Sequence, residues 1–201
     1  MRNFIILLLL SLILGCTENN SNTKTAFDYQ FFESHTLEKL NLKVKLPEDY
    51  KIMFYNAEVL DSMLLAYQSN PSDQWKLKEI STLYKQQKGK VVSFNNEYLM
   101  SSIVFHPMTY TPINEEAAKQ IGYSVRYHIK EANKEFDTNF ELSELKLGNA
   151  GENRYAMYHI SSIYGHNYAF LITQGYQSWV MNIYNDQVID YQAVIHSISF
   201  P

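Results

Sequence analysis

The chain has 201 residues, a formal net charge of −4 and a single cysteine, Cys16. This mildly acidic composition argues against a nucleic-acid-binding protein, which normally carries a basic patch or a high pI. One cysteine also excludes a disulfide within the chain, because that bond joins two thiols. The length fits one globular domain with a core of its own.

The chain begins with an apolar leader. Arg2 supplies a positive charge, and residues 4–14 are apolar apart from Ser11. This run fits the hydrophobic region of a signal peptide and is too short to span a bilayer as a helix. We therefore predict that residues 1–15 are a signal peptide and exclude them from the fold.

The leader ends in the sequence Leu-Ile-Leu-Gly-Cys at residues 12–16. This segment resembles the lipobox of bacterial lipoproteins, in which a leucine and a small residue precede an invariant cysteine. The resemblance implies that the thiol of Cys16 receives a diacylglyceryl group and that Cys16 becomes the first residue of the mature chain. Each buried methylene of an acyl chain contributes about 0.8 kcal/mol, so two or three chains anchor a protein firmly to a membrane.

Residues 16–36 are predicted to be the lipidated cysteine and a flexible tether. A flexible segment of about 20 residues spans roughly 25 Å, enough to hold a domain clear of the headgroups. The residue after Cys16 is Thr17. In the lipoproteins that this segment resembles, an aspartate there is associated with retention in the inner membrane. The resemblance therefore predicts a location in the cell envelope, anchored in the outer membrane, on either of its faces.

Residues 37–201 are predicted to form a single globular domain. Apolar and polar residues alternate over 40–46, which predicts a half-buried strand that ends at Pro47. Apolar residues then recur at helical spacing in two segments, each flanked by residues typical of helix ends. The sequence therefore predicts helices over 56–70 and 72–89.

A second strand is predicted over 97–107, and a long helix follows it over 111–134. Thr111 and Pro112 fit the N-cap and first helical position of this helix. Four strands, separated by turns that contain glycine, should then form an antiparallel meander. Their predicted ranges are 140–148, 154–165, 167–175 and 178–185. A short helix over 185–195 and a last strand over 197–201 complete the chain.

Both faces of the meander strands are largely apolar. In the strand over 178–185, Trp179 and Val180 are neighbours and therefore point to opposite faces. A sheet with one face in water would alternate apolar and polar residues instead. The sheet should thus be covered on both faces by helices. The predicted fold class is α+β, a three-layer sandwich around a mainly antiparallel sheet.

This order of elements over residues 40–201 is similar to the PsbP-like sandwich fold. The shared features are a first strand that runs into a proline turn, helices, a meander, a late helix and a terminal strand. The resemblance implies an α/β/α sandwich. Members of this fold resemble one another in architecture more than in chemistry, and many are binding or assembly factors. Function must therefore be argued from a site.

No pattern in the sequence identifies a catalytic residue. Ser124, in the segment Gly-Tyr-Ser-Val-Arg, has only the first half of a nucleophile elbow and lies inside a predicted helix. His159 and His166 flank the turn at Gly165 and could approach each other across a hairpin. They are candidate metal ligands, but catalytic zinc has three protein ligands, so a polar pair is the favoured interpretation. The sequence predicts no metal and no cofactor.

The favoured hypothesis is a lipid-anchored envelope protein that binds or helps assemble a partner, such as another envelope protein, without catalysis. Two alternatives stay open. An exported hydrolase or metal-dependent enzyme would need a polar cluster built by folding, for example His106, His159 or His166 with an acid. A small-molecule or glycan binder would need a deep apolar or aromatic pocket.

Six tyrosines on or beside the meander strands are candidates for such an aromatic groove. Because tyrosine favours strands in any case, packing within the sheet is the favoured interpretation of these residues. They are Tyr155, Tyr158, Tyr164, Tyr168, Tyr176 and Tyr184.

Overall fold

The computed structural model describes residues 32–53, 57–66, 69, 71–96, 101–163, 165–185 and 191–200. The predicted signal peptide, Cys16 and most of the predicted tether lie outside these ranges. No helix in the described ranges is both long and apolar enough to cross a membrane.

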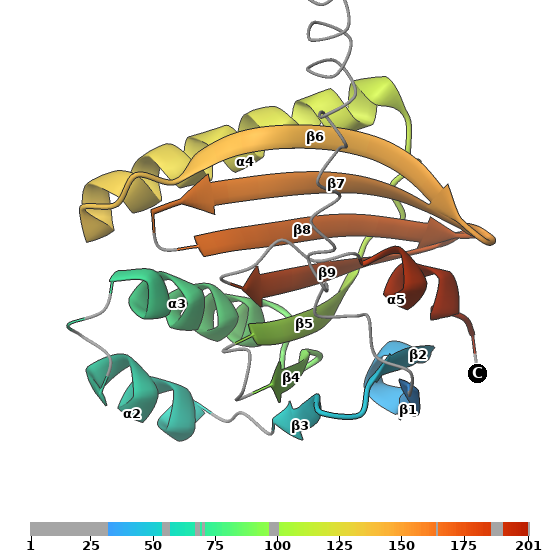
Figure 1. Cartoon of the computed structure of the whole chain (residues 1–201), viewed down its shortest axis with the longest axis horizontal. Coiled ribbons are helices and arrows are strands. Elements are labelled where there is room, and N and C mark those ends of the chain that lie inside the picture. Colours follow the sequence, from blue (N-terminus) through green and yellow to red (C-terminus); the bar gives the residue numbers. More distant parts are fainter. Residues whose placement is uncertain are drawn as a thin grey trace, which may run out of the picture.

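A seven-stranded sheet forms the middle layer of the domain, and every neighbouring pair of its strands is antiparallel. Its strands are β3 (Lys51–Met53), β4 (Val92–Asn96), β5 (Ser101–Met108), β6 (Glu141–Ala150), β7 (Asn153–Ser162), β8 (Gly165–Gln174) and β9 (Gln177–Asn185). Their spatial order is β3-β4-β5-β9-β8-β7-β6. The consecutive strands β6 to β9 are therefore neighbours, which confirms the predicted meander (Figure 1).

Three helices cover one face of this sheet. They are α2 (Ala57–Ala66), α3 (Pro71–Gln86) and α4 (Glu115–Phe136). In Figure 1, α4 runs along β6 and α3 lies beside β5. Their apolar side chains pack on residues of the sheet such as Val104 and Ile160, in a core that includes Trp75, Ile80 and Ile129.

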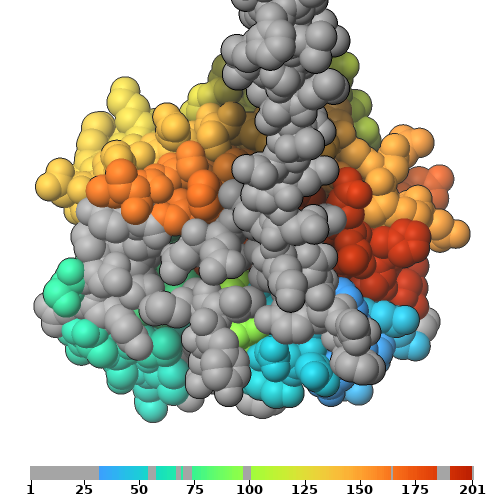
Figure 2. Space-filling model, in the orientation of Figure 1, coloured from blue at the N-terminus to red at the C-terminus, as the bar shows by residue number. Residues whose placement is uncertain are grey.

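A second layer covers the opposite face. It consists of a hairpin, β1 (Phe32–Leu37) and β2 (Leu42–Pro47), a 3-10 turn η1 (Glu38–Leu40) and helix α5 (Gln192–Ser197). Figure 2 shows α5, in dark red, directly beside the hairpin, in blue to cyan.

Hydrogen bonds join this second layer internally and to the sheet. The Lys45 N–H donates to the Ser197 side chain at 2.9 Å, linking the hairpin to α5. The Trp179 indole donates to the Leu40 carbonyl at 3.2 Å, linking the sheet to η1. The layer is thus fixed to the sheet as well as packed on it.

Alternate residues along each strand contribute to two hydrophobic cores, one on each face of the sheet. Trp179, Met181 and Ile183 of β9 face the hairpin and α5. Tyr184 of β9 and Leu171 of the neighbouring strand β8 face the large helices. Strand residues alternate between faces, so a strand that is apolar at every position needs cover on both sides. The predicted α+β three-layer sandwich is confirmed.

The predicted tether extends too far into the domain. Residues 32–36 belong to β1, whose pairing with β2 runs from Phe32 opposite Pro47 to Leu37 opposite Leu42. Asn41 closes the hairpin in the left-handed conformation. The error arose because the β1 segment has little apolar alternation, so pairing with β2 decides its structure.

Two further strands, β3 and β4, were not predicted, and three predicted elements begin or end elsewhere. The long helix begins at Glu115, because the Asn114 side chain accepts a hydrogen bond from the Ala117 N–H and caps it. The described part of the late helix is α5, which ends at Ser197 instead of residue 195, and residues 186–190 lie outside the described ranges. The last predicted strand is a single bridge between Ser199 and Lys43.

Candidate functional site

Two of the predicted site residues, His159 and His166, meet on the sheet. They lie on β7 and β8, and Nε2 of His159 is 2.9 Å from Nδ1 of His166. Ser143 on β6 extends this polar chain, with its Oγ 3.1 Å from Nδ1 of His159. The two histidines thus do approach across the hairpin. Cys16 lies outside the described residues, so the lipid anchor stays a prediction.

The geometry of the histidine pair is that of a hydrogen bond between side chains. Two nitrogens 2.9 Å apart share a proton and leave no space for an ion between them. Burial lowers the pKa of His159, and the charge of His166 lowers it further, while Glu144 opposes both. In the part of the chain that the structure describes, no three His, Cys, Asp or Glu side chains form a cluster that could hold a metal.

His106 does not join this pair. It is buried on β5 and lies opposite Val180 of β9, which in turn lies opposite Leu171 of β8. Leu171 packs beneath α4, so His106 is on the helix-covered face of the sheet. His159 lies in a different row, with Tyr168 opposite it, on the face that α5 covers. His106 therefore lies apart from the other two, and the three candidate histidines do not form one cluster.

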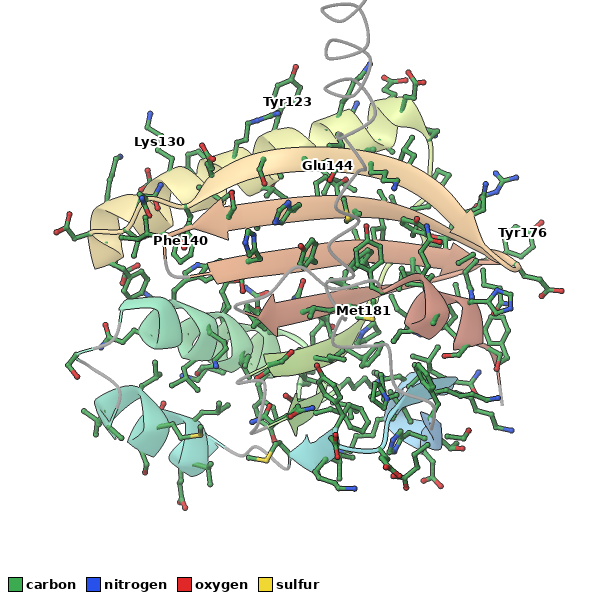
Figure 3. All side chains as sticks on the ribbon, in the orientation of Figure 1. Tyr123, Lys130, Phe140, Glu144, Tyr176 and Met181 are labelled. Atoms are coloured by element: carbon green, nitrogen blue, oxygen red, sulfur yellow. The ribbon has the colours of Figure 1, made fainter. Side chains whose placement is uncertain are left out.

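The described tyrosines do not line one common groove, although two of them, Tyr168 and Tyr184, border the cleft between α3, α4 and the sheet. Tyr155 and Tyr168 are buried on the α5 face, and Tyr158 and Tyr184 face the large helices. Tyr176 is exposed at the β8–β9 turn, where Figure 3 labels it. Tyr164 lies outside the described residues. Packing within the sheet is thus the correct interpretation of the four buried rings.

A cleft of about 360 Å³ lies between α3, α4 and the helix-covered face of the sheet. Its apolar walls include Trp75 and Leu83 of α3 and Ile129 of α4, and Tyr184 of β9 contributes to the floor. Ligand pockets in proteins typically have volumes of about 300–1,000 Å³. The cleft is therefore large enough for a small organic molecule.

The cleft lies beside a region of close packing between α3 and the end of α4. There the Trp75 ring lies 4.5 Å from that of Phe140, which follows α4, and Lys78 forms an ion pair with Glu135 of α4. Further along α3, Leu83 and three polar side chains line the space: Glu79, Thr82 and Gln86. Short or solvated polar side chains do not fill an interhelical gap as leucines would, so the gap stays open.

Polar side chains also line the floor of the cleft. Asn167 of β8 and Asn182 of β9 line it. Both are half-buried, and neither amide makes a hydrogen bond with another described residue. Their amide groups are thus available to bond a ligand in the cleft.

Glu79 and His128 face the same cleft from α3 and α4. Burial raises the pKa of Glu79, and the charges of His128 and Lys78 oppose that rise. The carboxylate of Glu79 has no hydrogen bond or ion pair with any described residue. It is therefore a partly desolvated acid without a fixed partner.

A wider groove of about 930 Å³ lies between the hairpin and α5. Although larger, it is more open to solvent, and fewer apolar side chains line it than line the α3–α4 cleft. Ser197 in this groove accepts from the Lys45 N–H and donates to the Val194 carbonyl. We therefore place the candidate site in the more enclosed and more apolar cleft between α3 and α4.

Sequence reasoning did not find this cleft. Its residues come from five elements, and their spacing in the chain carries no motif. The one available signal was an amide within an apolar strand, Asn182 between Met181 and Ile183. A buried polar residue is more informative than an exposed apolar one, so this amide could have pointed to the site.

Comparison with known proteins identifies the fold. No family model matches the chain, and no curated protein is similar to it in sequence. Its structure is similar to the solution structure of cyanobacterial PsbP (CyanoP) from Synechocystis sp. PCC 6803, with a TM-score of 0.53. The fold is PsbP-like.

The match covers 88% of this chain and 96% of CyanoP, at 10% sequence identity. The predicted resemblance to the PsbP-like sandwich is therefore confirmed for the fold. An identity this low does not extend to function, which in a PsbP-like fold must come from its own site.

Proposed function

We propose that this PsbP-like chain is a non-catalytic binding protein that is held at the bacterial envelope by a lipid on Cys16. Its ligand occupies the cleft between α3 and α4. The observation that carries the binding role is a set of polar side chains, Glu79, Asn167 and Asn182, that form no hydrogen bond or ion pair with another described residue and line a cleft of about 360 Å³ with apolar walls. A few convergent polar groups in an apolar pocket are typical of ligand sites.

The cleft supports binding in preference to the enzyme alternative. Catalysis of hydrolysis needs a nucleophile or activated water, a base within hydrogen-bond reach and donors for the developing charge. Glu79 and His128 face the cleft, yet within the described ranges neither forms a hydrogen bond with the other or with a serine. The cleft offers groups that orient a ligand, and we assign it that role.

A fragment screen on the purified protein tests the binding role. Neutral, anionic and cationic fragments are added to isotope-labelled protein, and NMR reports which residues they perturb. We expect perturbations at the side-chain amides of Asn167 and Asn182. Thr82→Trp, which fills the cleft from the exposed side of α3, should abolish them. Ser124→Trp, on the exposed surface of α4, is the matched control and should leave them intact.

The screen can also refute the proposal. If no fragment of any charge perturbs the cleft, or if Thr82→Trp leaves the perturbations unchanged, the cleft is not a binding site. A fragment that is chemically converted during incubation would instead show that the protein is catalytic.

The anchor is tested separately by metabolic labelling with radioactive palmitate and by membrane fractionation. Wild-type protein should incorporate label and sediment with membranes, because acyl chains on Cys16 bury methylenes in the bilayer. Cys16→Ala should lose both properties, and Thr17→Ala should retain them. Full membrane association of Cys16→Ala would refute the anchor and leave the binding site unaffected.

A further inference from the structure

The ionisable groups that line the α3–α4 cleft are unbalanced in charge. Glu79 is the single carboxylate among its described lining residues, and no Lys or Arg side chain lines it. The imidazole of His128 is the single basic side chain among them, and its charge lowers the pKa of Glu79 although the two form no ion pair. An anionic ligand would thus meet a carboxylate with only an imidazole to offset it. A cationic ligand would meet its counter-charge.

Lys78 lowers the pKa of Glu79 through its charge but forms its ion pair with Glu135 of α4 instead. Its Nζ lies 5.2 Å from the centre of the Phe136 ring. Because a partly desolvated carboxylate is costly without a partner, a cation placed beside Glu79 gains more than it would at an exposed acid. Among the described residues neither Lys78 nor His128 forms an ion pair with Glu79, so the position of a direct counter-ion is open to a ligand cation.

Aromatic rings line the same space. Trp75 and Tyr184 both border the cleft, and their ring centroids are 5.9 Å apart at an interplanar angle of 72°. The face of an indole or phenol ring attracts ammonium and guanidinium groups, and tryptophan attracts them best. The same rings also pack well against an apolar ligand body.

The floor provides acceptors for the N–H groups of such a ligand. Asn167 and Asn182 extend from adjacent strands of the sheet, β8 and β9, and their amide oxygens are free to accept. Side chains on a paired sheet are more precisely placed than side chains on loops. A carboxylate, two amide oxygens and two aromatic rings thus converge on one small volume.

We infer that the α3–α4 cleft selects a small organic cation, a primary amine or guanidinium group carried on an apolar body, with Glu79 as its counter-ion. This inference rests on the proposed function, because it names the class of ligand that the proposed binding site takes. Trp75 and Tyr184 hold the apolar body and border the charge, and Asn167 and Asn182 accept from its N–H groups.

Isothermal titration calorimetry with three probes of similar shape tests this selectivity. The probes are 2-phenylethylamine, 2-phenylethanol and 3-phenylpropionate, titrated into the full-length protein in detergent. The amine should bind at least tenfold more tightly than the alcohol, and the carboxylate most weakly. Glu79→Gln should weaken the amine at least tenfold and change the alcohol less than twofold.

Glu116→Gln is the matched control. It removes the same charge from an exposed position near the start of α4, outside the cleft lining, and should leave all three affinities unchanged. Circular dichroism confirms that each variant is folded. An effect of Glu116→Gln equal to that of Glu79→Gln would show that net charge, and not the cleft, determines affinity.

The possible outcomes separate this inference from the binding role. If the alcohol binds as tightly as the amine, or if Glu79→Gln leaves the amine unaffected, cation selectivity is wrong although the cleft binds ligands. If none of the three probes binds, the inference is also wrong, and the fragment screen then decides independently whether the cleft binds other chemistry.

Discussion

Asn153 fastens α5 to the sheet through its side-chain amide. The Nδ2 atom donates to the carbonyl oxygens of Ile195 and Ile198, both at 2.8 Å, and the side chain is buried with 1% exposed. These carbonyls belong to the last turn of α5 and the residue that follows it, where helix carbonyls lack partners within the helix. One residue of β7 therefore satisfies the end of the helix that closes the second layer.

The structure gives the size of the effect expected from Asn153→Leu, which keeps the volume and removes both donors. The Ile195 oxygen also accepts from the Ile198 N–H at 3.2 Å, so it loses one of two bonds, worth about 0.5–1.5 kcal/mol. The Ile198 oxygen has no other donor among the described residues, and leaving it buried costs about 1–3 kcal/mol. The free energy of unfolding should fall by about 1.5–4.5 kcal/mol.

Urea unfolding followed by tryptophan fluorescence measures this change. Asn149→Leu is the control, because Asn149 lies in the same β6–β7 hairpin but is exposed. It should change the free energy of unfolding by less than about 0.5 kcal/mol. If Asn153→Leu also costs less than about 0.5 kcal/mol, the two hydrogen bonds do not hold α5 in place and the reasoning is refuted.

Two further predictions concern packing and pH. Alanine at Gly148 would place its Cβ against the Tyr155 ring and should destabilise the protein by about 1–3 kcal/mol. Alanine at Gly122 in α4 would meet Tyr158 no closer than 3.7 Å and should stabilise it by about 0.5–1 kcal/mol. Thermal melts test both: a melting temperature that does not fall for Gly148→Ala, or does not rise for Gly122→Ala, would contradict that prediction. Burial lowers the pKa of His106 below 6.5, so the unfolded chain binds a proton more readily. The contribution of neutral His106 to the free energy of unfolding should be fully present above about pH 6.5 and should decrease as the pH falls towards the lowered pKa. His106→Gln should flatten this pH dependence. An unchanged slope would mean that other groups cause it.

The elements with a strong local pattern were predictable, and those without one were not. The meander strands are apolar on both faces, so their sequence alone indicated a sheet covered on both sides. The start of α4 depends on which of several nearby residues caps the helix. Asn114, and not Thr111, is the N-cap, because its side chain accepts a hydrogen bond from the Ala117 N–H. β3 has only three residues, too few for a period to appear, and its pairing with β4 defines it.

The sequence by itself determined the covered antiparallel meander, the long amphipathic helix and the approach of His159 to His166, because each depends on neighbours within one or two elements. Only the tertiary structure decided that β1 belongs to the domain, that His106 lies apart from the other two histidines, and that Glu79, Asn167 and Asn182 share a cleft. Local periodicity sets which way a side chain points within its element. The position of α3 against α4 and the sheet is set by packing between distant segments, and that packing creates the candidate site.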